Sequence, residues 1–263
     1  NTAAAAFAFF VPMGAAWPVR PAVAPSGPRL RVMTLNIHHA ASGVAGVATL
    51  VREAQPDLFC AQEANGFWRW EDPTPALARL LPEWRVVRAG DVATFSRLPI
   101  RAHRAHEMPG GDGRNILETV HEVGGKRVTV LNAHFDTASH PRSLLRSLLE
   151  EPRSVPAHLR DTARTRLEQA AMLLTLVEGA RAPLLVAGDF NTPPRGRLYG
   201  RLARPLRDSF RASGRGLGST FRADVPVLRI DYVWAGAGVT PLRCFVPGAR
   251  VSDHRAVIAD LAL

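Results

Sequence analysis

Lysine is almost absent from this chain of 263 residues. Of its 33 basic side chains only Lys126 is a lysine, and the remainder are arginines set against 23 Asp and Glu, which gives a net charge of +10. A basic surplus of this size is compatible with a nucleic acid or an anionic surface as partner. An excess of arginine with abundant alanine, glycine and proline is also typical of a biased genomic base composition, so the charge alone does not identify a partner.

Cysteine is scarce as well, with Cys60 and Cys244 the two present. Each lies in an apolar, strand-like run, and no spacing of cysteine and histidine typical of a structural zinc site surrounds either one. The sequence shows no disulfide framework and favours two buried free thiols over a single disulfide.

Long apolar runs are missing after residue 19. Residues 1–19 are uncharged and mostly apolar, but two prolines interrupt them, and a proline-rich stretch follows to residue 28. We expect an N-terminal extension over residues 1–28, either the remnant of a signal or anchor segment with a tether or a segment that packs on the domain. An export signal or anchor would place the protein outside the cytoplasm or on a membrane, and a cytoplasmic location stays open. Residues 29–263 are predicted to form one α/β domain.

The domain alternates short apolar runs with helical patterns. Helices are expected over residues 43–54 and 158–179, and residues 150–157 read as a loop because they contain two prolines. Two strands at 116–123 and 126–135 flank Gly124-Gly125, which is the two-residue loop of a tight hairpin.

Compact polar groups stand at the ends of these apolar runs. They are Asn36, Gln62-Glu63, Asn132 with His134 and Asp136, Asp189 with Asn191, Asp231, and Ser252-Asp253-His254. Rigid strands position side chains well at a sheet edge, where α/β proteins gather catalytic groups. One such group alone would indicate a turn or a helix cap. Six groups rich in carboxylates, amides and imidazoles, without a nucleophilic serine or cysteine, indicate metal-assisted hydrolysis.

The residues in these groups, and their order along the chain, resemble the motifs of a known family. TLNIHH, QE at 62–63, LNAHFDT, GDFNTPP, RIDYVWA and SDHRAV are similar to the motifs of the endonuclease/exonuclease/phosphatase superfamily. The resemblance covers residues 30–263 and implies a four-layer α/β sandwich, in which two mainly antiparallel β-sheets pack face to face between helices. It also implies hydrolysis of phosphate esters by an attacking water.

The resemblance assigns a metal role to three residues. Glu63 matches the principal ligand, Asn36 matches its neighbour, and Asp253 matches a further acidic group close to the metal. Carboxylate oxygens are hard ligands suited to Mg²⁺, and Mn²⁺ is the alternative cofactor.

Five further residues match catalytic positions. His254 corresponds to the histidine that activates water or stabilises the transition state, and Asp231 to the carboxylate that orients it. His134 corresponds to a second histidine. Asp189 matches the residue that positions the water or the leaving group, and Asn191 matches an amide that binds a phosphate oxygen.

Several positions stay open. His38 stands where many nuclease members carry an acidic residue, so a second or shifted metal site is in doubt. Arg114 either contacts the substrate phosphate or is a solvated residue of an edge strand. Arg166 and Gln169 are expected on the surface of the long helix.

The substrate beyond its phosphate ester is also open. The positive charge favours a nuclease, whereas the apolar N-terminus and the cluster Phe67, Trp68 and Trp70 favour a phosphodiesterase of lipid headgroups at a membrane surface. A binding module without catalysis is a further alternative. No protein partner is indicated.

Overall fold

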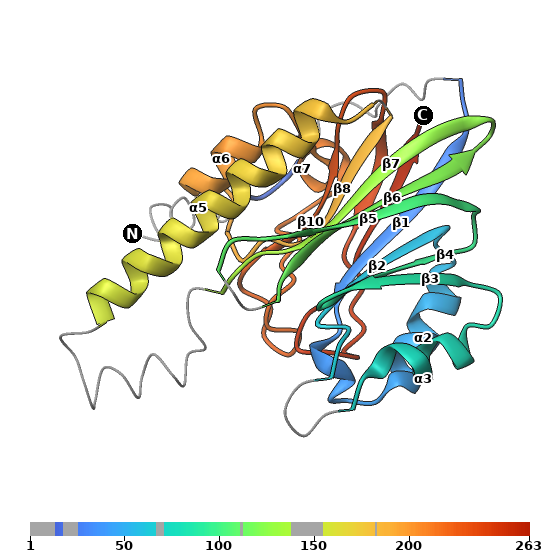
Figure 1. The fold of residues 1–263 in the computed structure, drawn as a ribbon, viewed down its shortest axis with the longest axis horizontal. Coiled ribbons are helices and arrows are strands. Elements are labelled where there is room, and N and C mark those ends of the chain that lie inside the picture. Colours follow the sequence, from blue (N-terminus) through green and yellow to red (C-terminus); the bar gives the residue numbers. More distant parts are fainter. Residues whose placement is uncertain (1–13, 18–25, 67–70, 111–112, 138–154, 182) are drawn as a thin grey trace.

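Two six-stranded β-sheets form the centre of the molecule (Figure 1). The computed structural model describes residues 14–17, 26–66, 71–110, 113–137, 155–181 and 183–263. In spatial order the first sheet contains β11 (Thr240–Phe245), β12 (Val257–Ala262), β1 (Arg29–Asn36), β2 (Leu58–Gln62), β4 (Val92–Ser96) and β3 (Arg85–Ala89). The second contains β5 (Ile100–Glu107), β6 (Asn115–Val123), β7 (Lys126–His134), β8 (Leu184–Asp189), β10 (Asp231–Ala235) and β9 (Arg207–Asp208).

The strand registers bring the polar ends of several strands to one edge. β1 and β2 are parallel with Asn36 opposite Gln62, and β7 and β8 are parallel with His134 opposite Asp189. The remaining pairs are antiparallel, and β10 places Asp231 opposite Asp189. The carboxyl ends of four strands and the amino end of β10 therefore meet at the same edge.

Helices cover the outer face of each sheet. α2 (Val44–Ala54) and α3 (Pro73–Leu80) pack on the first sheet, and α5 (Val155–Gly179) and α6 (Arg197–Leu202) pack on the second. A third apolar cluster, which includes Val32, Cys60, Val130 and Leu185, fills the space between the sheets. The four-layer sandwich implied by the resemblance is therefore confirmed.

Burial on both faces explains the unbroken apolar runs. Every residue of β2 and of β8 is buried, so neither strand alternates between apolar and polar side chains. Cys60 in β2 and Cys244 in β11 are buried free thiols, as predicted. The hairpin of β6 and β7 around Gly124-Gly125 is confirmed as well.

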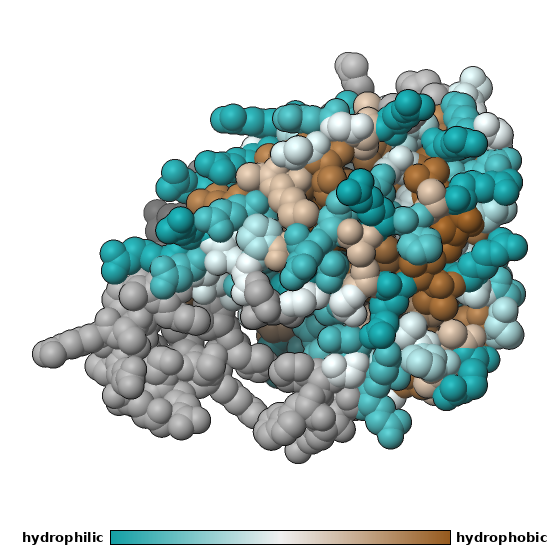
Figure 2. All heavy atoms as spheres, viewed as in Figure 1, coloured by the Kyte–Doolittle hydropathy of each residue, from teal (hydrophilic) through white to brown (hydrophobic). Residues whose placement is uncertain are grey.

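Some elements differ from the expectation. α5 begins at Val155, inside the expected loop of residues 150–157, because a proline at position 156 is compatible with the first turn of a helix; residues 150–154 lie outside the described residues. β5 was not predicted, since its sequence is largely exposed and charged, as is common for an edge strand. Hydrophilic residues cover much of the face seen in Figure 2.

Part of the N-terminal segment contacts the domain. Ala16 is buried and forms a β-bridge with Gly216. Residues 1–13 and 18–25, and the aromatic cluster Phe67, Trp68 and Trp70, lie outside the described part of the chain. Within that part, no helix is both long enough and apolar enough to cross a membrane.

Candidate active site

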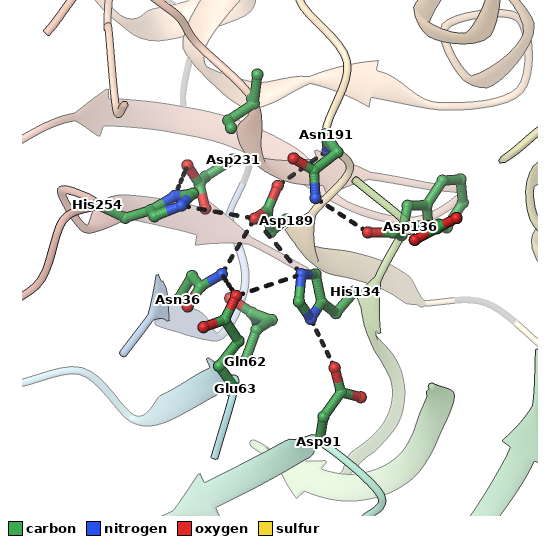
Figure 3. Close-up of polar contacts among 12 residues, drawn as sticks. Asn36, Gln62, Glu63, Asp91, His134, Asp136, Asp189, Asn191, Asp231 and His254 are labelled. Carbon is green, nitrogen blue, oxygen red and sulfur yellow. Dashed lines mark hydrogen bonds and ion pairs between the residues drawn. The ribbon is translucent and has the colours of Figure 1, made fainter. Parts of the chain in front are cut away.

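Asp189 lies at the centre of the converging strand ends (Figure 3). It is the last residue of β8 and is 1% exposed. Its Oδ1 accepts a hydrogen bond from the backbone N–H of Asn191 (2.9 Å), and its Oδ2 accepts one from Nδ2 of Asn36 (3.2 Å). Burial and the negative charge of Asp231 raise the pKa of Asp189 to about 6, against the lowering effect of His254 and His134. A carboxylate with this pKa is suited to accept a proton near neutral pH.

The glycine before Asp189 is required by the backbone. Gly188 has φ of +148°, and a Cβ added to it would lie 1.8 Å from the carbonyl oxygen of Ala133 on β7. Only a residue without a side chain allows β7 and β8 to approach this closely. The glycine of the GDFN motif thus holds Asp189 beside His134.

His254 and Asp231 form a buried pair on one side of Asp189. Nδ1 of His254 lies 2.9 Å from Oδ2 of Asp231, and Nε2 of His254 lies 3.8 Å from Oδ2 of Asp189. Burial alone would lower the pKa of His254, but Asp231, Asp189 and Asp253 raise it, and the result is a pKa of about 10. The imidazole is therefore a cation at neutral pH, with Nδ1–H donating to Asp231 and Nε2–H directed toward Asp189.

His134 and Asp91 form a similar pair on the other side. Nδ1 of His134 lies 2.6 Å from Oδ2 of Asp91, while Nε2 lies 3.7 Å from Oδ2 of Asp189 and 3.9 Å from Oε1 of Glu63. Sequence reasoning missed Asp91, which stands beside Gly90 in the turn before β4 and matches none of the recognised motifs. Its 8% exposure is what separates it from an ordinary turn aspartate.

Arg114 borders this second pair and is not a solvated edge residue. Its side chain is 16% exposed, and its Nη1 lies 2.6 Å from Nδ1 of His134 and 3.5 Å from Oδ2 of Asp91. A guanidinium only donates hydrogen bonds, so Nδ1 of His134 either accepts from Arg114 or donates to Asp91, depending on which tautomer is present.

Glu63 and Asn36 lie at the ends of β2 and β1, close to both histidines. Oε1 of Glu63 accepts a hydrogen bond from Nδ2 of Asn36 (2.9 Å), and the Glu63 side chain is 24% exposed. Burial would raise the pKa of Glu63, but His134, the bond from Asn36, and His39 lower it overall, so the carboxyl is ionised. Oδ1 of Asn36 accepts from the backbone N–H of His38 (3.0 Å), which directs its amide N–H₂ at the two carboxylates.

Glu63 has the chemistry of a divalent metal ligand: an ionised, hard and partly exposed oxygen donor. Asp253 is 37% exposed on its side chain and lies 3.7 Å from Nδ1 of His38; among the residues that the structure describes, no hydrogen bond or ion pair joins it to Glu63. Asp189, Asp231 and His254 also bring ligand atoms within 4.8 Å of one another, so these three residues form a second group that could hold a metal ion.

The loop after β8 is held by α5. Nδ2 of Asn191 donates to the carbonyl of Phe135 (3.0 Å), and the carbonyl of Asn191 accepts from Nη1 of Arg166 (2.6 Å). Gln169 is 1% exposed and accepts from the backbone N–H of Asp136. The expectation that Gln169 is a surface residue is therefore wrong, and Arg166 is half-buried. Both side chains support the loops that carry the site.

The chain is similar to a known protein family. The sequence model of the Endonuclease/Exonuclease/phosphatase family matches residues 33–254, which include every site residue named above. A comparison with curated proteins gives no significant match.

Solved structures share the fold. A Beutenbergia cavernae endonuclease/exonuclease/phosphatase is 22% identical with a TM-score of 0.67, over 90% of this chain and 72% of that one. A family protein from Bacteroides thetaiotaomicron is 17% identical with a TM-score of 0.71, over 91% and 99%. A mannosyl-6-phosphatase of the same organism is 17% identical with a TM-score of 0.69, over 89% and 100%. At these identities the likeness is one of fold.

Proposed function

The chain belongs to the endonuclease/exonuclease/phosphatase family, and on this premise we propose that it is a metal-dependent phosphodiesterase that uses water as its nucleophile. Members of the family are hydrolases that act on phosphoester bonds and generally use a divalent metal. One observation carries the proposal: two buried imidazole–carboxylate pairs direct their Nε2 atoms, at 3.7 and 3.8 Å, toward the same oxygen of Asp189.

The charges of these groups suggest their roles. Asp189, with its pKa raised to about 6, accepts a proton from the attacking water as the water oxygen bonds to phosphorus. The cationic His254 donates its Nε2–H to a phosphate oxygen, where negative charge grows as the ester bond breaks. In the tautomer whose Nδ1 accepts from Arg114, His134 donates its Nε2–H from the opposite side, and the leaving oxygen takes its proton from His254.

The residues around Glu63 support the metal dependence. A divalent cation bound there would neutralise the charge that develops on the phosphate. Asn36 holds one oxygen of Glu63 and one oxygen of Asp189, so its amide sets the distance between the metal ligand and the proton acceptor. We assign Asn36 to this positioning role and Asp253 to the rim of the site.

We place nucleic acid first among the substrates, because 33 basic residues against 23 acidic ones favour a polyanion. A lipid-headgroup phosphodiester is the second candidate, and one feature of the loop at residues 221–228 favours it. Phe221 pairs with His254, and the tip of the loop exposes 66% of Val225 and 45% of Val227. Exposed apolar side chains on a loop that also contacts His254 suit an enzyme that works at a membrane surface.

The proposal is tested by comparing substrates side by side. Plasmid DNA, vesicles with sphingomyelin or phosphoinositides, and a sugar monophosphate are incubated with the protein and Mg²⁺ or Mn²⁺. We expect cleavage of DNA, abolished by EDTA and in Glu63→Ala. Cleavage of the vesicle lipids alone would make the second candidate the function, and cleavage of the monoester alone would overturn the diester assignment. No cleavage together with no metal binding would support a binding module.

A further inference from the structure

The turn after β1 has an unusual backbone that brings a histidine to Glu63. His38, His39 and Ala40 have φ of 49°, 50° and 52°, in the left-handed region that non-glycine residues seldom adopt. Hydrogen bonds hold this conformation, since His38 N–H donates to Oδ1 of Asn36 and His39 N–H donates to the carbonyl of Glu63 (both 3.0 Å). Strain of this kind is found mostly at functional sites.

The His39 ring is oriented by a backbone carbonyl. Its Nδ1 lies 2.9 Å from the carbonyl oxygen of Asn65, and because a carbonyl only accepts, Nδ1 carries the hydrogen. Its Nε2 lies 3.4 Å from Oε2 of Glu63. Histidines that bind metals almost always donate their other ring N–H to a carbonyl or carboxylate in this way.

The distance between Nε2 and Oε2 suits a shared ion better than a direct hydrogen bond. Charge-assisted N–H···O bonds measure about 2.7–2.9 Å, and His106 with Glu118 makes such a bond at 2.8 Å on β5 and β6. A separation of 3.4 Å between the two donor atoms is one that two ligands of a single ion would have. Oε1 of Glu63 is held by Asn36, so Oε2 is the oxygen that faces His39.

We infer that His39 Nε2 and Glu63 Oε2 together bind the divalent cation, so that this centre prefers a first-row transition ion to Mg²⁺. The inference rests on the proposed function, because it takes Glu63 as the metal ligand. Mg²⁺ favours oxygen ligands and retains its waters, whereas an imidazole nitrogen strengthens binding of transition ions. The mixed ligand set therefore sets the metal selectivity of the site.

Pulsed electron paramagnetic resonance of the Mn²⁺-loaded full chain tests this directly, since a nitrogen bound to Mn²⁺ produces a ¹⁴N modulation. The test variant is His39→Asn, because asparagine tolerates a left-handed φ and its amide can still donate to Asn65. His38→Asn, on the same turn, is the matched control. Should His39→Asn fail to fold, His39→Gly, which adopts this φ without strain, replaces it.

We expect the ¹⁴N modulation in the wild type and in His38→Asn, and its loss in His39→Asn. The Mn²⁺ affinity of His39→Asn should fall about 10-fold or more, while the Mg²⁺ affinity, measured by competition, should change much less. Bound Mn²⁺ without ¹⁴N modulation in the wild type, or a signal that survives in His39→Asn, overturns the inference. Mn²⁺ binding by Glu63→Ala separates this inference from the proposed function. If Glu63→Ala no longer binds Mn²⁺, Glu63 remains the metal ligand of the proposed function even when His39 is not a ligand. If Glu63→Ala binds Mn²⁺ as well as the wild type does, Glu63 is not the metal ligand and the proposed metal site is refuted.

Discussion

Two buried histidines in this molecule have opposite charge behaviour. His121 lies on β6 between the two sheets, is 0% exposed, and bonds to the hydroxyls of Ser96 and Thr119. Burial lowers its pKa to about 4. His254, at the edge where the candidate site residues meet, is 5% exposed and bonds to Asp231, and its pKa is raised to about 10.

The contrast shows that the neighbours of an imidazole, and not its burial, decide its charge. Both rings have lost nearly all contact with water, which disfavours the cation in each. Hydroxyls offer His121 no compensating charge, so it stays neutral and serves the core. Three carboxylates surround His254 and hold it as a cation, which is the form that stabilises a phosphate transition state. Each prediction below tests one side of this contrast.

The largest effect is expected on turnover when His254 is changed to asparagine. The Asn amide can take the place of Nδ1 and donate to Asp231, but the Nε2–H that faces the phosphate is lost. We expect kcat to fall by about 10³-fold or more, as for removal of a preorganised charge donor. Initial rates on the cleaved substrate measure this, with circular dichroism to check the fold. A variant with near wild-type kcat would remove His254 from the mechanism.

The next effect concerns stability in acid and involves His121. In the range between its folded pKa of about 4 and an unfolded value near 6.5, the unfolded chain binds more protons than the folded one. Stability therefore falls as the pH drops through this window, by about 3 kcal/mol in full. His254, with a folded pKa above the unfolded one, contributes stability that is complete below pH 6.5 and declines as the pH rises toward 10.

Urea unfolding of the wild type and of His121→Gln at pH 7.5 and pH 4 isolates this contribution. Gln keeps a donor and an acceptor for Ser96 and Thr119 but does not titrate. The free energy of unfolding of His121→Gln should therefore fall by about 3 kcal/mol less than that of the wild type between pH 7.5 and pH 4. The comparison within each protein cancels the other titrating groups. Equal losses in the two proteins would mean that His121 does not carry the acid sensitivity.

The fold was largely predictable because several of its strands, such as β2 and β8, are buried on both faces. Continuous apolar runs such as Leu184–Asp189 mark such strands regardless of their neighbours. β5 escaped prediction because an exposed edge strand lacks any apolar pattern. The start of α5 was placed late because proline was read as a breaker, although position 156 lies in the first turn.

The site was predictable where a residue stands in a motif at a strand end, as Asp189 does, or shortly before a strand, as His254 does. Asp91 was missed because its role depends on the packing of one sheet against the other, which brings the turn before β4 to the end of β7. Gln169 was misjudged for a related reason, since only the docking of α5 reveals that it holds the backbone of Asp136. Contacts between sequence-distant elements carry no local signal.

The smallest effect is expected from Asp231→Asn, and it separates two roles of His254. An Asn at 231 can donate its amide N–H to Nδ1, which fixes the neutral tautomer with the hydrogen on Nε2. That tautomer still donates to the phosphate, although without a full charge. We therefore expect kcat to fall by about 10-fold, and the alkaline limb of the pH–rate profile to move below the value near 10 that Asp231 helps to maintain.

If His254 instead took the proton of the attacking water, the same tautomer would block it, because Nε2 would already carry a hydrogen. Asp231→Asn would then be as damaging as His254→Asn, with a loss of about 10³-fold or more. Rates of the two variants across pH 5 to 10 decide between these cases. If Asp231→Asn loses little kcat and its alkaline limb shifts, Asp189 is the general base and His254 is the hydrogen-bond donor. If Asp231→Asn and His254→Asn lose kcat equally, His254 is the general base.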